Sequence, residues 1–138
     1  MVHKKPYLLQ FESIGDDKTG YHSYAEYASS LPFETKRVFW MYNTPEEMSR
    51  VNSANAKTKN VFVCLHGKAS FYIENVKGKS YEFTISSLDM GLYIPEMHWK
   101  RITLSDHAVL LGMSSEKFEE VDFIRDFAVF KQSVKRKI

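Results

Sequence analysis

The feature that most constrains the fold is a series of short apolar or alternating segments, each of which ends at turn-forming residues. The clearest spans residues 33–42, where Arg37 and Phe39 fall on one face and Val38 and Trp40 on the other. Side chains of a β-strand point alternately to its two faces, so this period of two predicts a strand. Many short strands separated by turns are typical of a sandwich or barrel, and we therefore expect an all-β fold.

Two hairpins are predicted around turn-forming glycines. Residues 61–65 and 69–73 flank Gly67, and a turn at residues 75–78 leads into a strand over residues 81–85. Glycine adopts the backbone conformations of tight turns at little cost. The remaining strands are expected over residues 7–11, 92–94, 99–104 and 108–113.

The pattern changes near the C-terminus. Phe123, Ile124, Phe127 and Phe130 recur at helical spacing. They predict a short amphipathic helix that covers one end of the fold or a neighbouring subunit. No internal repeat, low-complexity tract or linker-like stretch divides the chain, so residues 1–138 are expected to form a single domain around one core.

Charge, cysteine content and the length of apolar runs indicate the kind of protein and its setting. The formal net charge is only +2, so nothing requires a nucleic acid, and we interpret the basic run at residues 131–137 as a solvated tail. Cys64 is the single cysteine, which excludes an internal disulfide and suits a reducing cytoplasm. We find neither a signal peptide nor an apolar run long enough to span a membrane, and we expect a cytoplasmic protein.

The reactive side chains are few. Cys64 lies in the middle of a predicted strand with no histidine placed to activate it, so we interpret it as a small buried apolar residue. His66 and His107 stand at predicted turns. No two of the five histidines show the i, i+2 or i, i+4 spacing that builds a metal site on one element.

Two segments have the spacing of the cupin motifs without their chemistry. The first motif normally reads His-x-His-(three or four)-Glu-(six)-Gly, and the second reads Pro-x-Gly-x-x-His. In this chain the four ligand positions hold Ser53, Asn55, Asn60 and Lys100. None supplies the imidazole, carboxylate or thiolate that divalent transition metals bind. The resemblance implies a cupin jelly-roll barrel, and these residues predict one that binds no metal.

The same region carries positive charge. Arg50 and Lys57 flank the first motif, and with Lys100 they would form a pocket suited to phosphate or pyrophosphate. Arg37 interrupts an aromatic strand and needs an anionic partner if it points inward. His98 shares a strand face with Lys100 because side chains alternate. The alternatives are ordinary surface lysines and a buried structural histidine.

Nearly the whole chain, from about Phe11 to Phe130, resembles the small cupin enzymes that move the ketone of dTDP-4-keto-6-deoxyglucose from C4 to C3. The resemblance implies a metal-free, cofactor-free homodimer, often with exchanged N-terminal strands. Its substrate would be a dTDP-linked hexose, used to make deoxysugars of surface glycans such as lipopolysaccharide. The segments that carry the resemblance are residues 31–42, 63–67, 91–99 and 114–127.

One motif departs from that family. It normally reads Arg-Gly-x-His-Ala-His-Lys, and here Arg50 matches, while Ser53 and Asn55 replace the two histidines and Lys57 stands one place late. Neither serine nor asparagine acts as a base near neutral pH without activation. Loss of a general base typically costs roughly 10²- to 10⁴-fold in rate.

Two hypotheses follow. In the first, the chain is an active 3,4-ketoisomerase in which Lys100 or His98 replaces the lost base and Tyr42 acts as the acid. In the second, it is a non-catalytic nucleotide-sugar-binding or regulatory homologue. A different reaction on a related sugar, such as epimerisation, has no residue in its favour. The expected substrate-binding residues are Arg37, Arg50, Ser53, Asn55, Lys57 and Asn60.

Overall fold

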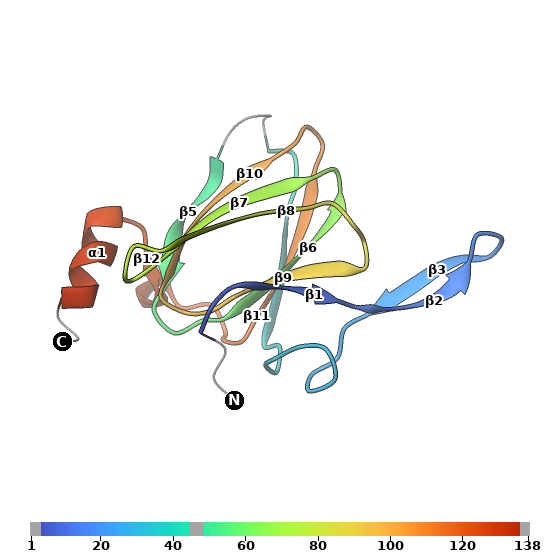
Figure 1. The fold of residues 1–138 in the computed structure, drawn as a ribbon, viewed down its shortest axis with the longest axis horizontal. Helices are drawn as coiled ribbons and strands as arrows, with labels where there is room; N and C mark the ends of the chain where they lie inside the picture. Colours follow the sequence, from blue (N-terminus) through green and yellow to red (C-terminus); the bar gives the residue numbers. More distant parts are fainter. Residues whose placement is uncertain (1–3, 45–48, 136–138) are drawn as a thin grey trace.

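Two five-stranded antiparallel sheets face each other in the computed structural model, which describes residues 4–44 and 49–135 (Figure 1). The first sheet has the order β1-β9-β6-β11-β4 and contains β1 (Tyr7–Gln10), β4 (Arg37–Met41), β6 (Asn60–His66), β9 (Met90–Ile94) and β11 (Val109–Ser114). The second has the order β12-β5-β10-β7-β8 and contains β5 (Ser49–Asn55), β7 (Ala69–Asn75), β8 (Ser80–Ile85), β10 (His98–Leu104) and β12 (Phe123–Ile124).

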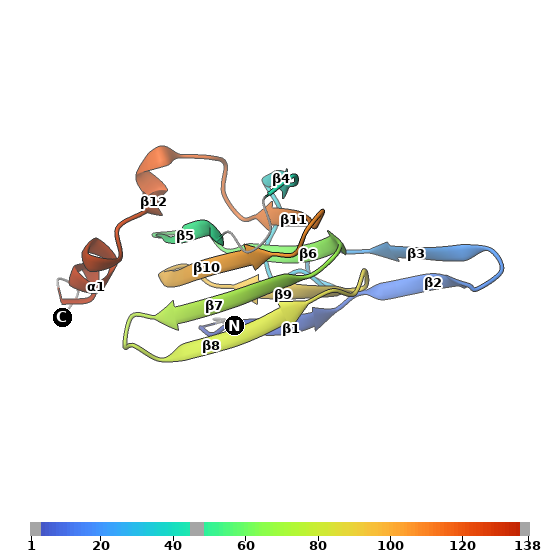
Figure 2. The same cartoon turned by 90° about the horizontal axis from the view of Figure 1, so that it is seen from above.

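The chain crosses repeatedly between these sheets, as in a jelly roll, and among the described strands no ladder joins the sheets into a closed barrel (Figure 2). A 3-10 turn, η1 (Glu120–Asp122), and one helix, α1 (Phe127–Lys135), follow the last long strand. The prediction of an all-β domain with a short C-terminal helix is therefore confirmed. Helix α1 has nine residues, and no helix in the described part of the chain is long and apolar enough to cross a membrane.

The main core lies between the sheets, and a second cluster covers the outer face of the first sheet. Strand β6 explains both, because its side chains alternate between the two faces. Phe62 and Cys64 join the inner core, whereas Val61 and Val63 pack with Tyr93 and the segment before β4. Cys64 is fully buried, and burial raises the pKa of its thiol, as its interpretation as an apolar core residue requires.

The predicted hairpin across Gly67 is wrong. Strand β6 pairs with β9 and β11, while β7 pairs with β8 and β10. Gly67 does take the turn conformation, with φ of 76°, but the turn carries the chain from one sheet to the other. The second predicted hairpin, β7–β8 with Gly78 at φ of 89°, is confirmed.

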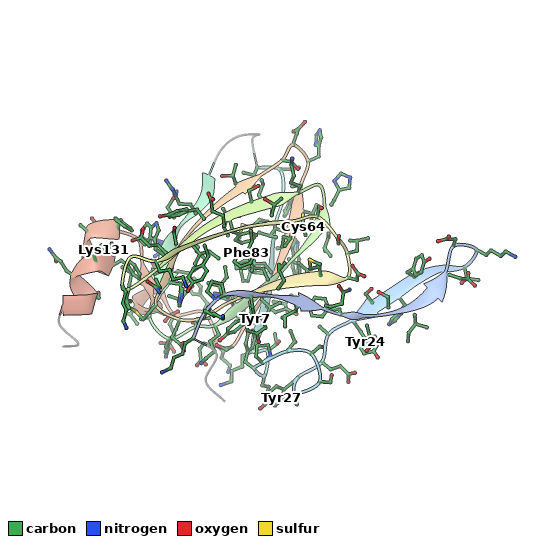
Figure 3. All side chains as sticks on the ribbon, viewed as in Figure 1. Tyr7, Tyr24, Tyr27, Cys64, Phe83 and Lys131 are labelled. Atoms are coloured by element: carbon green, nitrogen blue, oxygen red, sulfur yellow. The ribbon has the colours of Figure 1, made fainter. Side chains whose placement is uncertain are left out.

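The predicted C-terminal helix begins later than the spacing suggested. Phe123 and Ile124 form strand β12, which pairs with Asn55 and Ala54 of β5. Helix α1 starts at Phe127 and packs its aromatic side chains against Trp99. Figure 3 shows Lys131 on this helix, while Cys64 and Phe83 lie within the two-sheet body. Tertiary pairing overrides the helical periodicity in the first half of the segment.

A two-stranded arm was not predicted. Strands β2 (Glu12–Asp16) and β3 (Gly20–Tyr24) pair with each other and project from the body of the domain (Figure 1). All of their residues are exposed. The sequence did not indicate these strands, because neither has the apolar alternation that burial produces.

Candidate functional site

The candidate site is a cavity of about 310 Å³ between the two sheets. Its walls come from β4, β5, β6 and β10 and from the segment that follows β11. Two side chains in it carry positive charge, those of Arg37 and Lys100. The full lining is Arg37, Phe39, Met41, Ser53, Asn55, Asn60, Phe62, Lys100, Phe118 and Phe123.

The four positions that hold metal ligands in other cupins meet in this cavity. Ser53 of β5 stands opposite Lys100 of β10 in the strand pairing. The Lys100 ammonium donates to the side-chain oxygen of Asn55 at 2.8 Å, and the Asn60 amide donates to the same oxygen at 3.3 Å. A hydroxyl, two amides and an ammonium do not fit a transition-metal ion. Among the described residues, no three histidine, cysteine or acidic side chains cluster to hold one.

Lys100 combines deep burial with a lowered pKa. Its relative exposure is 4%. Burial lowers its pKa to about 8, and the charge of Asp122 opposes that effect. A lysine with a pKa near 8 is partly neutral near physiological pH, and a neutral amine is able to accept a proton.

Asp122 is a buried carboxylate that sequence reasoning missed. Burial acts to raise its pKa, but hydrogen bonds from Thr58, the Lys57 backbone and Asn55 hold the pKa below its ordinary value. The Asn55 amide donates to it at 2.9 Å, and the Lys57 N–H at 2.7 Å. Because it lies 67 residues from Asn55, in an acidic stretch, no local signal separated it from its solvated neighbours.

Arg37 faces inward, a point that the sequence left open. Its guanidinium donates to the Ser114 hydroxyl at 3.2 Å, and that hydroxyl donates to the side-chain oxygen of Asn60 at 2.6 Å. The guanidinium carbon also lies 5.2 Å from the ring centre of Phe39 and 5.5 Å from that of Phe118. Arg37 is therefore part of the polar network, with aromatic rings around it.

Three other predicted site residues have different positions. Tyr42 is 61% exposed and does not line the cavity. The Lys57 side chain forms an exposed ion pair with Glu119 at 3.2 Å, so its link to the site is its backbone. The side chain of Arg50 lies outside the described residues; its backbone belongs to β5.

His98 is buried but borders a different cavity from Lys100. Its Nδ1 lies 2.9 Å from the carbonyl oxygen of Glu96, and because a carbonyl only accepts, Nδ1 carries the hydrogen. The Nε2 atom is buried without a hydrogen-bond partner among the described residues. It borders a cavity of about 430 Å³ that also contains Lys4 and Lys77. Burial lowers the pKa of His98, so its ring is neutral at pH 7.

The comparisons with known proteins agree with one another. The family model described as FdtA: WxcM-like, C-terminal matches residues 4–135. The TDP-4-oxo-6-deoxy-alpha-D-glucose-3,4-oxoisomerase of Aneurinibacillus thermoaerophilus is 28% identical over 128 residues, which cover 92% of this chain and 91% of that relative.

Solved structures show the same architecture. A 3,4-ketoisomerase from Helicobacter canadensis matches with a TM-score of 0.89 and 25% identity, over 96% of this chain and 99% of that one. QdtA, a sugar 3,4-ketoisomerase from Thermoanaerobacterium thermosaccharolyticum solved with TDP, matches with a TM-score of 0.89 and 24% identity, over 97% of each chain.

Fold and cavity together define a small cupin-like jelly-roll protein whose ligand positions are filled by a hydrogen-bonded polar network. The family model covers nearly the whole chain. The chain belongs to the FdtA family.

Proposed function

We propose that this protein is a 3,4-ketoisomerase that binds a dTDP-linked 4-keto-6-deoxyhexose in the Lys100 cavity. The observation that carries the proposal is Lys100 itself. It lines the cavity at a cupin ligand position, is buried, and has a pKa of about 8. Its amine is thus poised to exchange a proton with a bound sugar. The relatives named as 3,4-ketoisomerases support the class of reaction.

The chemistry needs one group that takes a proton from C3 and delivers a proton to C4, and an amine exchanges its protons with solvent between these two steps. Neutral Lys100 removes the proton from C3 of the sugar while the C4 oxygen is protonated, which yields an enediol. The acid that protonated the C4 oxygen, now deprotonated, then takes the proton of the C3 hydroxyl, and the Lys100 ammonium delivers a proton to C4, leaving a ketone at C3. The positive charges of Arg37 and Lys100 favour the negative charge that develops on the sugar oxygens. Ser53, Asn55 and Asn60 line the same cavity, and we propose that they contact the polar groups of the sugar.

The other predicted roles remain proposals. Tyr42 and His98 do not line this cavity, so the acid that protonates the C4 oxygen is proposed to be a group brought in by the substrate or by a second subunit. Arg50 and Lys57 lie at or next to β5 and are proposed to meet the nucleotide phosphates. A cavity of about 310 Å³ is at the small end for a ligand site, which suits the hexose with the nucleotide extending outward.

The test is incubation with dTDP-4-keto-6-deoxyglucose in deuterated water, followed by proton NMR. The expected result is a 3-keto sugar with deuterium at C4, and substrate that carries deuterium at C3 after reversal. The matched control is protein inactivated by heat. Sugar signals that show neither a 3-keto product nor deuterium, together with line broadening of the nucleotide signals, would contradict turnover but support binding.

That last outcome corresponds to the second candidate function, a nucleotide-sugar-binding homologue without catalysis. It is favoured by one observation: Ser53 and Asn55 stand where the family motif has histidines. If the nucleotide signals do not broaden and the sugar is not converted, both functions are rejected.

A homodimer is proposed from two exposed features. Val38 and Trp40 project from β4 with 50% and 60% exposure, and Tyr42, the residue after β4, is 61% exposed. Strand β4 is an edge strand of its sheet. The β2–β3 arm is exposed throughout and suits an exchange between subunits. Apolar surface of this kind marks protein contacts.

Light scattering of the unaltered protein should give twice the mass of one chain. Trp40→Glu should lower that mass, whereas the control Lys36→Glu should not. A monomeric unaltered protein would contradict the proposed homodimer.

The cellular setting is proposed with the reaction. A dTDP-sugar isomerase would act in the cytoplasm, where nucleotide sugars are made, and would serve deoxysugar synthesis for surface glycans such as lipopolysaccharide. Neither a nucleic acid nor a membrane is proposed as a partner.

A further inference from the structure

Asp122 is the buried carboxylate of the site, and neither the cupin motifs nor the comparisons assign it a role. We infer that Asp122 is a positioning residue that holds Lys100 through the side chain of Asn55. The inference rests on the proposed function for its effect on rate, but its structural part is testable on the unliganded protein. Asn55 lies between the two charges, 2.8 Å from the Lys100 nitrogen and 2.9 Å from an Asp122 oxygen.

The direction of the Asn55 amide follows from the chemistry of its neighbours. An ionised carboxylate only accepts hydrogen bonds, and an ammonium only donates them. The Nδ2 of Asn55 must therefore face Asp122, and its Oδ1 must face Lys100. The Asn60 amide donates to the same oxygen at 3.3 Å, which reinforces this orientation. The carboxylate thus determines which end of the amide the lysine meets.

Asp122 is itself firmly held. The Thr58 hydroxyl and the Lys57 N–H donate to its two oxygens. Its backbone carbonyl accepts from Ala56 at 2.8 Å. The next residue, Phe123, pairs with Asn55 in the ladder between β12 and β5. A carboxylate with this many fixed donors cannot turn away, so it acts as an anchor for the amide.

The charges around Lys100 make the carboxylate matter. Arg37 is the other cation of the cavity. His98 lies two residues before Lys100 on β10, and its neutral ring adds no charge. Asp122 is the acidic group whose charge favours the Lys100 ammonium. Without it, the amide would be free to turn its NH₂ toward Lys100, and the ammonium would lose both its acceptor and its compensating charge.

The experiment compares Asp122→Asn with Glu120→Gln, a control in the same turn whose exposed side chain pairs with Arg125. For Asp122→Asn we expect kcat to fall roughly 10- to 100-fold with KM changed less than about threefold, since positioning is lost and not substrate contact. The acidic limb of the pH profile should move to lower pH by roughly 0.5–1 unit, because the charge that favours the ammonium is gone. Glu120→Gln should change neither.

An activity-independent measurement accompanies the kinetics. The titration of the Lys100 side chain is followed by NMR of lysine-labelled protein, with Lys100→Met used to assign its signal. In Asp122→Asn the midpoint should fall, and an unmoved midpoint overturns the inference whatever the rate does. If the unaltered enzyme shows no turnover, the proposed function fails, while this titration still tests the link between Asp122 and Lys100.

A second variant covers the case in which Asp122→Asn does not fold. Asn55→Leu removes the connecting amide and leaves Asp122 with its Thr58 and backbone donors. It should lower kcat roughly 10- to 100-fold by itself. Where Asp122→Asn also folds, the two losses should not add in the double variant. Additive losses, or an Asn55→Leu protein with unaltered kcat, would overturn the claim that Asp122 acts through Asn55.

Discussion

Replacing Lys100 with methionine is expected to lower turnover of the keto sugar by roughly 10²- to 10⁴-fold, the usual cost of losing a general base. Methionine has a similar length and fills the same buried space, so the variant should still fold. The measurement is the NMR assay of ketone migration, with thermal unfolding recorded beside it.

The matched control is Lys79→Met, a change at an exposed lysine in the β7–β8 turn, which should leave turnover unaltered. A Lys100→Met protein that retains turnover within about tenfold of the parent would remove Lys100 from the role of base, since that loss falls below the range for such groups. The base would then have to be sought among the other groups that line the cavity.

The contribution of Lys100 to the free energy of unfolding is expected to rise by about 3 kcal/mol as the pH increases from 8 to 10.5. Lys100 has a pKa of about 8 in the folded chain against an ordinary value of 10.5. Below pH 8 both states hold its proton, and the folded state bears the full cost of burying the charge. Between the two values the unfolded chain binds a proton that the folded chain has released, so stability rises with pH.

Urea unfolding of the parent and of Lys100→Met at several pH values measures this effect. The difference between the two proteins isolates Lys100, because buried tyrosines act equally in both. Burial raises the pKa of Tyr93, for example, which lowers stability at high pH in each protein. A difference that does not change with pH would show that Lys100 titrates alike in the folded and unfolded chains.

Local patterns predicted the strands well where burial is one-sided. The alternation in residues 33–42 appears in β4, where Arg37, Phe39 and Met41 are partly buried and the residues between them are exposed. The β2–β3 arm escaped notice because exposed strands show no such alternation. The turn at Gly67 was correctly located but wrongly assigned to a hairpin, since a turn residue does not determine which sheet receives the next strand.

The site shows the same division. Motif spacing brought Ser53, Asn55, Asn60 and Lys100 into one expected site, and the structure places all four on one cavity. The exposed position of Tyr42 was not predictable, because a strand's period gives two faces without saying which one borders the cavity. The roles of these four residues and of Tyr42 in catalysis and binding remain proposals.

The sequence by itself determined the all-β class, the two-residue alternation of β4 and the residue types at the cupin ligand positions, which are not those of a metal site. These properties depend on residue type and on spacing within one element. Only the tertiary structure decided that Asp122 meets Asn55 and that Phe123 leaves the helical pattern to pair with β5. Such contacts join segments far apart in the chain, and the burial that lowers the pKa of Lys100 exists only after both sheets have packed.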